Sequence, residues 1–326
     1  VNSMTTVPTD VLARTVALAC RAPSYHNSQP WQWIANRDGL DLFLDPSRLV
    51  QTDLNERQAL ISCGAVLDHL RVAMAAAGWR AHIDRLPDSK NSEHLASISF
   101  TEMTVVSDGD RRRAEAIVKR RTDRLPLGPV MDWAGFETAL RSRLDDTMAL
   151  VDVVSDADRS ELVEATYLTN VLRFYDTNDF EALHRWTAPF EASEGIPYDS
   201  LVSAAEGERV DVGRKFLPTH HPERRPQVPN DFSTILVISA HEHTRRDTLG
   251  CGETLSTVLL EATAAGLASC TLTHVTELSV TRHLIERVTG RAFPQVLARI
   301  GCAPENEHFP PPTPRRSLAD VLTIKP

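Results

Sequence analysis

Apolar residues follow two patterns along this chain, the 3.6-residue spacing of helices and the alternation of strands. Helical spacing predicts helices over residues 9–20, 56–77, 111–121, 132–144, 156–187, 250–265 and 277–289. Alternation, or a short continuous apolar run, predicts strands over residues 31–45 (a hairpin turning at 37–39), 95–101, 147–155, 232–240, 269–275 and 296–303. Helices and strands therefore occur throughout the chain.

The ends of several predicted helices carry specific signals. Gly78 and Gly266 follow the two long helices, at the C′ position where glycine adopts a positive φ without strain. Thr9 or Asp10 is the expected N-cap of the first helix.

Two segments of the chain resemble each other. "CGAVLDHLRVAMAAAGW" (63–79) and "CGETLSTVLLEATAAGL" (251–267) both open with Cys-Gly and reach a second glycine fourteen residues later. The short strands "LASISF" and "LARIGC" follow in the same order. Two matched segments suggest two related halves. The alternative is a chance similarity between two alanine-rich helices.

Residues 188–230 form a long segment without regular periodicity, rich in proline and glycine. A loop of this length inside a compact protein is typically a lid, a binding segment or an arm. The C-terminal "PPPTPRRSLADVL" is stiffened by proline and then briefly helical.

Composition limits the classes of protein that the chain can represent. Its 326 residues are 42% hydrophobic and carry a net charge of −9, which predicts a sizeable core and disfavours nucleic acid or an acidic membrane as a partner. We expect no membrane span and no signal peptide, because no run of eighteen apolar residues and no basic start followed by an apolar block occurs. The odd count of 5 cysteines, without C-x-x-C, favours reduced thiols in the cytoplasm.

The stretch "APSYHNSQPWQW" (22–33) crowds rigid and hydrogen-bonding residues into one turn between a helix and a strand. Ser24, Asn27 and Gln29 could face a planar heteroaromatic ligand, because amides both donate and accept. The alternative is an ordinary helix-to-strand turn with Trp31 in the core.

Two basic stretches are candidates for a phosphate site. In "KRRTDRLPL" (119–127), an extended backbone sends Arg120, Thr122 and Arg124 to one side. Pro314–Arg316 places two arginines after prolines near the C-terminus. Either stretch could instead be a solvated basic segment.

Other kinds of site find little support. The pairs His220–His221 and His241 with His243 lack the further ligands and spacing of a metal site. The sequence contains no G-x-S-x-G, G-x-G-x-x-G or Walker A motif, which disfavours an α/β-hydrolase, a Rossmann dinucleotide site and a P-loop.

These motifs occur together in a known order. An R-R-[ST]-x-R stretch, an A-P-S-x-x-N-x-Q-P-W turn, an R-I-G strand and a proline-arginine tail resemble the FMN-dependent nitroreductase superfamily, and within it the internally duplicated, nitroreductase-like Acg family of mycobacteria and other actinobacteria. The resemblance implies an α+β nitroreductase-like FMN-binding fold with mostly antiparallel sheets, duplicated as a single-chain pseudo-dimer.

The motifs are divided between the two halves of the chain. Residues 9–107 hold the turn, and residues 111–326 hold the basic motif and the arginine tail. In ordinary nitroreductases each FMN lies between two protomers, so the resemblance implies one complete FMN site per chain and a monomer. The 188–230 segment is then a candidate lid.

The resemblance also implies the residues that contact FMN. They are Pro23, Ser24, His26, Asn27, Gln29, Arg120, Thr122, Arg124, Thr271, Leu272, Thr273, His274, Arg315 and Arg316. Arg120 and Thr122 would hold the phosphate or ribityl oxygens, with Arg315 and Arg316 closing the phosphate. Arg124 would lie near the pyrimidine edge, where a cation favours the reduced flavin.

The turn would pack on the flavin ring, and the loop around Thr273 would direct a backbone N–H at N5. The implied activity is NAD(P)H-dependent reduction of a small nitroaromatic or quinone, without a catalytic side chain. Tyr25 and His26 stand where ordinary members have small residues, so the alternative is a protein that stores FMN or senses redox state with little turnover. A third reading is an interaction protein without flavin.

Overall fold

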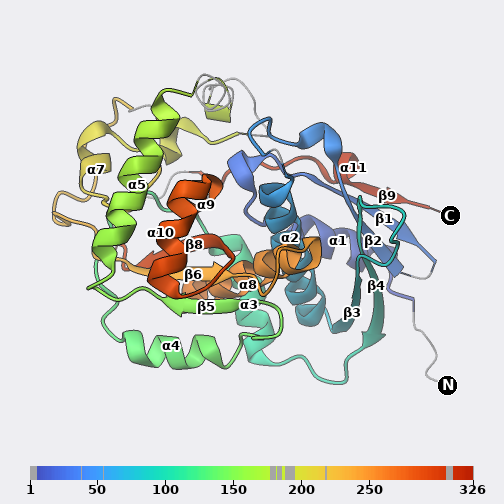
Figure 1. Ribbon diagram of the computed structural model, residues 1–326. Helices are drawn as coiled ribbons and strands as arrows, with labels where there is room; N and C mark the ends of the chain where they lie inside the picture. The colour runs from blue at the N-terminus through green and yellow to red at the C-terminus, as the bar shows by residue number, and fades with distance from the viewer. Residues whose placement is uncertain are drawn as a thin grey trace.

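The computed structural model describes residues 6–37, 39–53, 55–176, 181, 186–187, 195–216, 219–305 and 311–325. Two sheets lie on either side of a central pair of long helices (Figure 1). The helices are α1 (Thr9–Ala19), α2 (Arg57–Ala76), α3 (Asp108–Lys119), α4 (Trp133–Arg141), α5 (Arg159–Phe174), α7 (Ala204–Glu208), α8 (Arg245–Ala264), α9 (His274–Glu277), α10 (Ser279–Thr289) and α11 (Leu318–Val321).

The first sheet has the strand order β3-β4-β2-β1-β9. Its strands are β1 (Trp31–Asn36), β2 (Gly39–Leu44), β3 (Trp79–Arg85), β4 (His94–Glu102) and β9 (Leu322–Ile324). Strands β1 to β4 pair antiparallel, and β9 from the C-terminus adds parallel to β1, with Trp33 opposite Leu322. The end of the chain is therefore built into the sheet formed by its beginning.

The second sheet has the order β5-β6-β8-β7 and is antiparallel throughout. Its strands are β5 (Leu150–Val153), β6 (Thr234–Ser239), β7 (Ala268–Leu272) and β8 (Pro294–Gly301). All eight positions of β8 are buried, as expected for a strand paired on both edges and covered on both faces. Mixed helices with mostly antiparallel sheets confirm the predicted α+β class.

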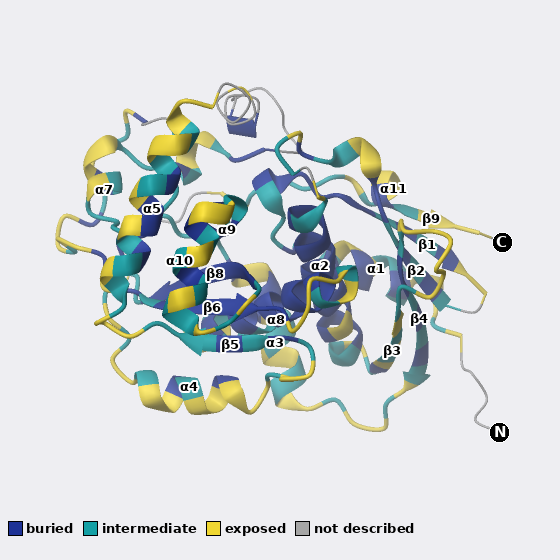
Figure 2. Ribbon diagram, in the orientation of Figure 1, coloured by how far each residue is buried: buried dark blue, intermediate teal, exposed yellow. Residues whose placement is uncertain are grey.

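Helices α2 and α8 cross at the centre of the molecule, and both are largely buried (Figure 2). A Cβ on Gly64 would lie 2.9 Å from Gly252 Cα and would collide with the Leu249 carbonyl oxygen. Reciprocally, a Cβ on Gly252 would lie 2.9 Å from Gly64 Cα and would collide with the Ile61 carbonyl oxygen. The two glycines of the repeated Cys-Gly pairs thus allow the helix backbones to touch.

Most predicted elements are present, with shifted ends. Helix α8 starts at Arg245 rather than at 250, because the Thr244 hydroxyl accepts a hydrogen bond from the Asp247 amide and caps the helix there. The first helix is preceded by Pro8, which is its N-cap in place of Thr9 or Asp10. Strand β3 was not predicted. The extended stretch at 269–275 ends at Leu272, where α9 follows.

Gly78 and Gly266 have φ of 88° and 77°, which confirms their predicted place after the long helices. Helix α2 has the length and apolar character of a membrane span, but 83% of its most apolar stretch is buried inside the protein. It is therefore the core helix of this fold. All five cysteines are free.

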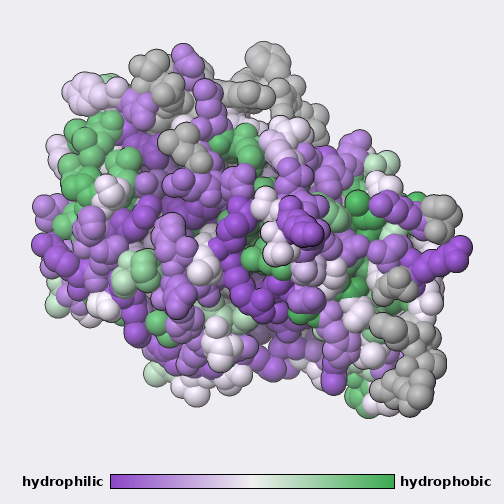
Figure 3. All heavy atoms as spheres, turned by 45° about the vertical axis from the view of Figure 1, so that its right-hand side comes forward, coloured by the Kyte–Doolittle hydropathy of each residue, from purple (hydrophilic) through white to green (hydrophobic). Residues whose placement is uncertain are grey.

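Hydrophilic residues make up most of the face in Figure 3, and apolar residues gather there only in small groups. A surface of this kind agrees with the net charge of −9.

Candidate functional site

A cavity of about 540 Å³ lies where the first half of the chain meets the second. One wall is the turn Pro23–His26 with the start of α2, and another is the segment around Thr122 with the β7–α9 connection, Thr271–His274. Residues between Ile196 and Phe216 line it from a third direction. The volume is within the range of small-molecule and cofactor sites.

The turn that forms the first wall has an unusual backbone. His26, Asn27 and Gln29 have φ of 52°, 58° and 52°, a left-handed conformation rare outside glycine. Ser24 Oγ accepts from the Gln29 amide at 3.0 Å and the Tyr25 amide donates to Ser62 Oγ of α2, also at 3.0 Å, so local contacts hold this shape. Backbone strain maintained in this way is common at binding sites.

Asn27 and Gln29 are not among the residues that line the cavity. Asn27 Nδ2 donates to the Pro314 carbonyl at 3.1 Å, and Gln29 Oε1 accepts from the Arg316 amide at 2.8 Å. The Arg316 guanidinium lies 3.4 Å from the Asp45 carboxylate. These three predicted ligands therefore fasten the C-terminal segment to the turn.

Thr122 and Arg124 line the second wall. Thr122 forms a parallel bridge with Ser269, which aligns this segment with the start of β7. The Arg124 guanidinium lies 5.2 Å from the Phe216 ring centroid and donates to the Ser200 carbonyl at 3.3 Å. Burial lowers the pKa of Arg124.

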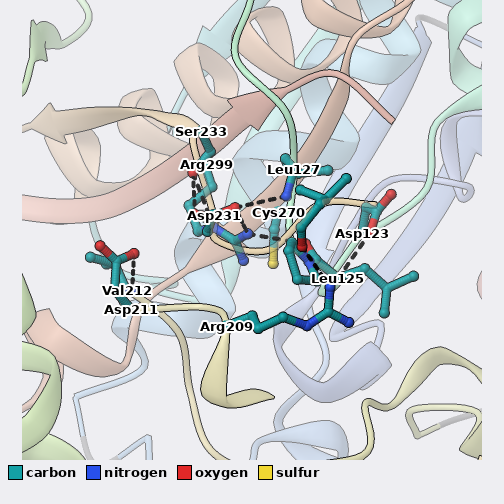
Figure 4. Close-up of polar contacts among 12 residues, drawn as sticks. Asp123, Leu125, Leu127, Arg209, Asp211, Val212, Asp231, Ser233, Cys270 and Arg299 are labelled. Atoms are coloured by element: carbon teal, nitrogen blue, oxygen red, sulfur yellow. Dashed lines mark hydrogen bonds and ion pairs between the residues drawn. The ribbon is translucent and has the colours of Figure 1, made fainter. Parts of the chain in front are cut away.

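Buried ion pairs fix the segment that carries these two residues (Figure 4). Asp231 accepts from Arg299 Nη2 of β8 at 2.5 Å and from the Leu127 amide at 2.9 Å. Asp123 pairs with Arg225 at 2.6 Å. Arg299 is 1% exposed, and the pairing with Asp231 raises its pKa despite the burial. These buried pairs hold the backbone of the second wall in position.

An arginine cluster lies beside the turn, made of Arg21, Arg120, Arg121 and Arg315. Within the described part of the chain, no carboxylate lies within ion-pairing distance of any of the four. Burial and the neighbouring guanidinium groups lower the pKa of Arg120 to about 10 and that of Arg315 to about 9. Arg120 is 6% exposed and the other three are half-buried, so a group of guanidinium ions without a carboxylate partner is suited to an anion.

Two members of the arginine cluster contact the backbone just before the turn. Arg315 donates to the carbonyls of Cys20, Arg21 and Ala22 at 3.0 to 3.2 Å. Arg120 reaches the Arg21 carbonyl at 3.4 Å, and its Nε is buried without a partner. Neither side chain lines the cavity, but both adjoin Pro23, which does.

His26 and His274 line the cavity and are 6% and 1% exposed. Both nitrogens of each ring are buried without a partner among the described residues. Burial, with the positive charge of Arg214, lowers the pKa of His274 to about 3 and that of His26 well below its ordinary value. Both imidazoles are therefore neutral at physiological pH.

Sequence reasoning missed Glu277, the last residue of α9. Burial of its carboxylate would raise its pKa, but the surrounding Arg214, Arg173 and Arg57 outweigh this effect and lower the pKa to about 2. Thr273 Oγ1 donates to it at 3.0 Å. Only the four-residue spacing from Thr273 hinted at this link, because the three arginines come from distant parts of the chain.

The 188–230 segment contributes Val202, Arg214 and Phe216 to the cavity wall, among others. Arg214 Nη1 donates to the Tyr25 hydroxyl at 3.1 Å, which joins this segment to the turn. Residues 188–194 and 217–218 lie outside the described part of the chain. The described residues of this segment thus form part of the cavity wall.

No protein-family model matches the chain. It is 50% identical over 98% of both chains to the Mycobacterium tuberculosis protein named "Putative NAD(P)H nitroreductase acg". It is 34% identical to "Putative NAD(P)H nitroreductase Rv3131" of the same organism, over 95% of this chain and 90% of that one. Among solved structures, an FMN- and NADPH-dependent nitroreductase NfnB from Sphingopyxis matches with 17% identity and a TM-score of 0.41, over 66% of this chain and 99% of that one.

Proposed function

Because the chain belongs to the Acg family of nitroreductase-like proteins, we propose that it binds one FMN and reduces small nitroaromatic or quinone substrates with NAD(P)H. The observation that carries the proposal is the cavity between the two halves with the arginine cluster beside it. A mostly apolar cavity next to arginines that have no carboxylate partner among the described residues fits a ligand with a flat ring and a phosphate.

The described residues fit both ends of FMN. The arginine cluster has no carboxylate partner in the described chain, and the buried Nε of Arg120 lacks an acceptor that a phosphate oxygen would supply. Arg124 lines the cavity and forms no ion pair with the described residues, and the pyrimidine edge of a flavin offers acceptors for its N–H groups. Arg315 would complete the phosphate site while it holds the backbone before the turn.

The chain's own residues do three things in this proposal. Pro23 and Ser24 of the strained turn would support the flavin ring, and Thr273, which follows β7, would border it from the second half of the chain. The segment that ends at Phe216 excludes water. FMN supplies the hydride chemistry when bound, so no catalytic side chain is needed.

We also propose that the two halves, 9–107 and 111–326, arose by duplication and form a pseudo-dimer within a monomer. The reciprocal contact of Gly64 with Gly252, which are 188 residues apart, supports this relation. At the same offset, Ala65, which lines the cavity, corresponds to Glu253.

In this proposal, side chains occupy the position at which the pseudo-dimer would have a second FMN site. Glu253 forms a two-pronged pair with Arg85 at 2.6 and 2.7 Å, and both side chains are mostly buried. Arg246, which corresponds to Gln58 of the cavity wall, donates to the Arg85 carbonyl at 3.2 Å. These groups support a single FMN per chain.

A second candidate function is the holding of FMN with little turnover. The segment between Ile196 and Phe216 favours this function, because its Arg214 donates to the Tyr25 hydroxyl and lies 3.9 Å from the Glu277 carboxylate. These contacts join the segment to the turn and to α9. A cover held closed would keep out both NAD(P)H and substrate.

Stopped-flow mixing of the FMN-loaded protein with NADPH tests the proposal. Loss of the flavin absorbance near 450 nm within seconds (roughly 1 s⁻¹ or faster, in the ordinary range of enzyme turnover) supports the reductase. Flavin that dithionite bleaches but NADPH does not would support the holding function. A protein that takes up no FMN contradicts both.

A further inference from the structure

Glu277 contacts two of the residues that form the cavity wall. Gln58, in the first turn of α2, donates from Nε2 to Glu277 Oε1 at 3.4 Å. Thr273, which precedes α9, donates from Oγ1 to the same oxygen at 3.0 Å. Gln58 and Thr273 line the cavity, and Glu277 is not among the lining residues. One carboxylate oxygen therefore joins a cavity residue from each half of the chain.

The charge of Glu277 decides which atoms these two residues have left for a ligand. The three arginines around it keep its carboxylate ionised at physiological pH. An ionised carboxylate only accepts hydrogen bonds, so Gln58 directs an N–H at it and Thr273 its single O–H. Within the described chain, no donor reaches Gln58 Oε1 or Thr273 Oγ1. The lone pairs of both oxygens are therefore left for a ligand.

The backbone on either side of this pair is held by further hydrogen bonds. The Asp53 carboxylate accepts from the amides of Gln58 and Ala59 at 3.0 and 2.8 Å, which anchors the first turn of α2. The Thr273 carbonyl accepts from the Thr276 amide at 3.0 Å and from the Thr276 hydroxyl at 2.8 Å. Gln58 is 3% exposed, so its neighbours also restrict its rotamer. These contacts hold the two acceptor oxygens in position.

Among the molecules of the proposed reaction, the reductant carries the donors that match two acceptors. The carboxamide of nicotinamide has two N–H groups on one nitrogen. Nitro and quinone groups offer only acceptor oxygens, and oxidised flavin has one ring N–H, at the pyrimidine edge that the proposed function assigns to Arg124. Thr273 also borders the proposed flavin site, so a carboxamide bound here would lie beside the flavin ring.

We propose that Gln58 and Thr273 bind the carboxamide of NAD(P)H, and that Glu277 is the positioning residue that leaves both oxygens free to accept from it. The inference rests on the proposed function, since the nicotinamide has to reach bound FMN, and it adds the atoms that recognise the reductant. A dinucleotide without the carboxamide N–H groups binds less well, because the oxygens of Gln58 and Thr273 lose water without gaining a donor.

The test measures binding without turnover, with oxidised FMN-loaded protein and two oxidised dinucleotides. NADP⁺ is compared with its 3-acetylpyridine analogue, in which a methyl ketone replaces the carboxamide, so that charge and carbonyl remain and both N–H donors are lost. Each Kd is measured from the difference spectrum of the flavin. The variants are Gln58→Leu, Thr273→Val and Glu277→Gln. Gln51→Leu, at an exposed position before α2, is the control for loss of a glutamine.

Wild type should bind NADP⁺ about tenfold more tightly than the analogue, the effect of one or two hydrogen bonds. Gln58→Leu and Thr273→Val should each reduce this ratio to about threefold or less, by raising the Kd of NADP⁺. Glu277→Gln should also reduce it, because an amide both donates and accepts and no longer fixes which atoms face the cavity. A merely structural loss raises both Kd values alike and keeps the ratio, and Gln51→Leu should keep it too.

Two results overturn the inference. One is equal affinity of wild type for the two dinucleotides. The other is a wild-type ratio in both Gln58→Leu and Thr273→Val, and loss of FMN from these variants would then assign the two residues to the cofactor. A wild-type ratio in Glu277→Gln alone refutes its positioning role. FMN uptake by wild type and its reduction by NADPH are measured first, so a failure of the proposed function is recognised separately and removes the inference with it.

Discussion

Replacing Gly252 by alanine should destabilise the protein through the crossing of α2 and α8. The added Cβ would lie 2.8 Å from the Ile61 carbonyl carbon and 2.9 Å from Gly64 Cα, and would collide with the Ile61 oxygen. All of these atoms are backbone, so no side chain can rotate away. Ordinary carbon–carbon contacts are about 3.5–4.0 Å, which requires the helices to separate by about 1 Å.

Separating the two helices lowers the free energy of unfolding by an amount that can be estimated. Overpacking a close-packed interior costs about 1–3 kcal/mol, and a backbone collision belongs at the upper end of that range. Alanine regains up to about 1 kcal/mol of helix propensity over glycine. The expected net loss in the free energy of unfolding is therefore about 2 kcal/mol, and Gly64→Ala should lose a similar amount.

Urea denaturation followed by far-UV circular dichroism measures the loss. The matched control is Gly109→Ala in α3, where the nearest atoms to the new Cβ are 3.5 and 3.8 Å away. This control should be as stable as wild type or slightly more so. Gly252→Ala with wild-type stability or better would refute the account of the crossing.

Three further predictions follow from the site. Arg120→Met should weaken FMN binding about 10- to 100-fold, as expected for the loss of charge-assisted hydrogen bonds to the phosphate, and should leave riboflavin binding unchanged. Fluorescence titration measures both affinities, and an equal loss for the two flavins would argue against a phosphate role for Arg120. Arg124→Leu should make the potential of bound FMN about 30–60 mV more negative, since a two-electron couple shifts by 30 mV per ~1.4 kcal/mol; an unmoved potential in a dye-equilibration assay places Arg124 away from the ring. The lowered pKa of Glu277, about 2 against an ordinary 4.5, means that its charge stabilises the fold above pH 4.5 and that this contribution, about 3 kcal/mol, is lost as the pH falls from 4.5 toward 2. Glu277→Gln should therefore be less stable than wild type at pH 7, with a difference that narrows over that interval; a constant gap in urea melts from pH 7 to 2.5 contradicts the assignment.

The local features of this fold could be predicted from the sequence. Gly78 and Gly266 end their helices as expected, and the hairpin turns between Asn36 and Gly39. These features depend on backbone preference and nearest-neighbour patterning. Strand β3 could not be found in this way, because its exposed positions carry Arg80, His82 and Asp84 in place of a clear apolar signal.

The site was only partly predictable, for a physical reason. A sequence motif shows which residues are close along the chain, but it does not show which segments pack together. Asn27 and Gln29 hydrogen-bond to Pro314 and Arg316 because the C-terminal segment lies against the turn. The three arginines around Glu277 come from α2, α5 and the segment between Ile196 and Phe216. Their spacing along the sequence gives no sign that they meet. Contacts between distant segments decide which polar groups are left for a ligand.

The stoichiometry of FMN in the reconstituted protein tests the central claim most directly. Apoprotein would be saturated with FMN, freed of excess by gel filtration, and its flavin absorbance compared with protein concentration from amino-acid analysis, with the molar mass measured by light scattering in the same run. The account predicts one FMN per chain in a monomer of about 36.2 kDa. Two FMN per chain, or a dimer that binds a single FMN, would contradict a single site made from both halves of one chain.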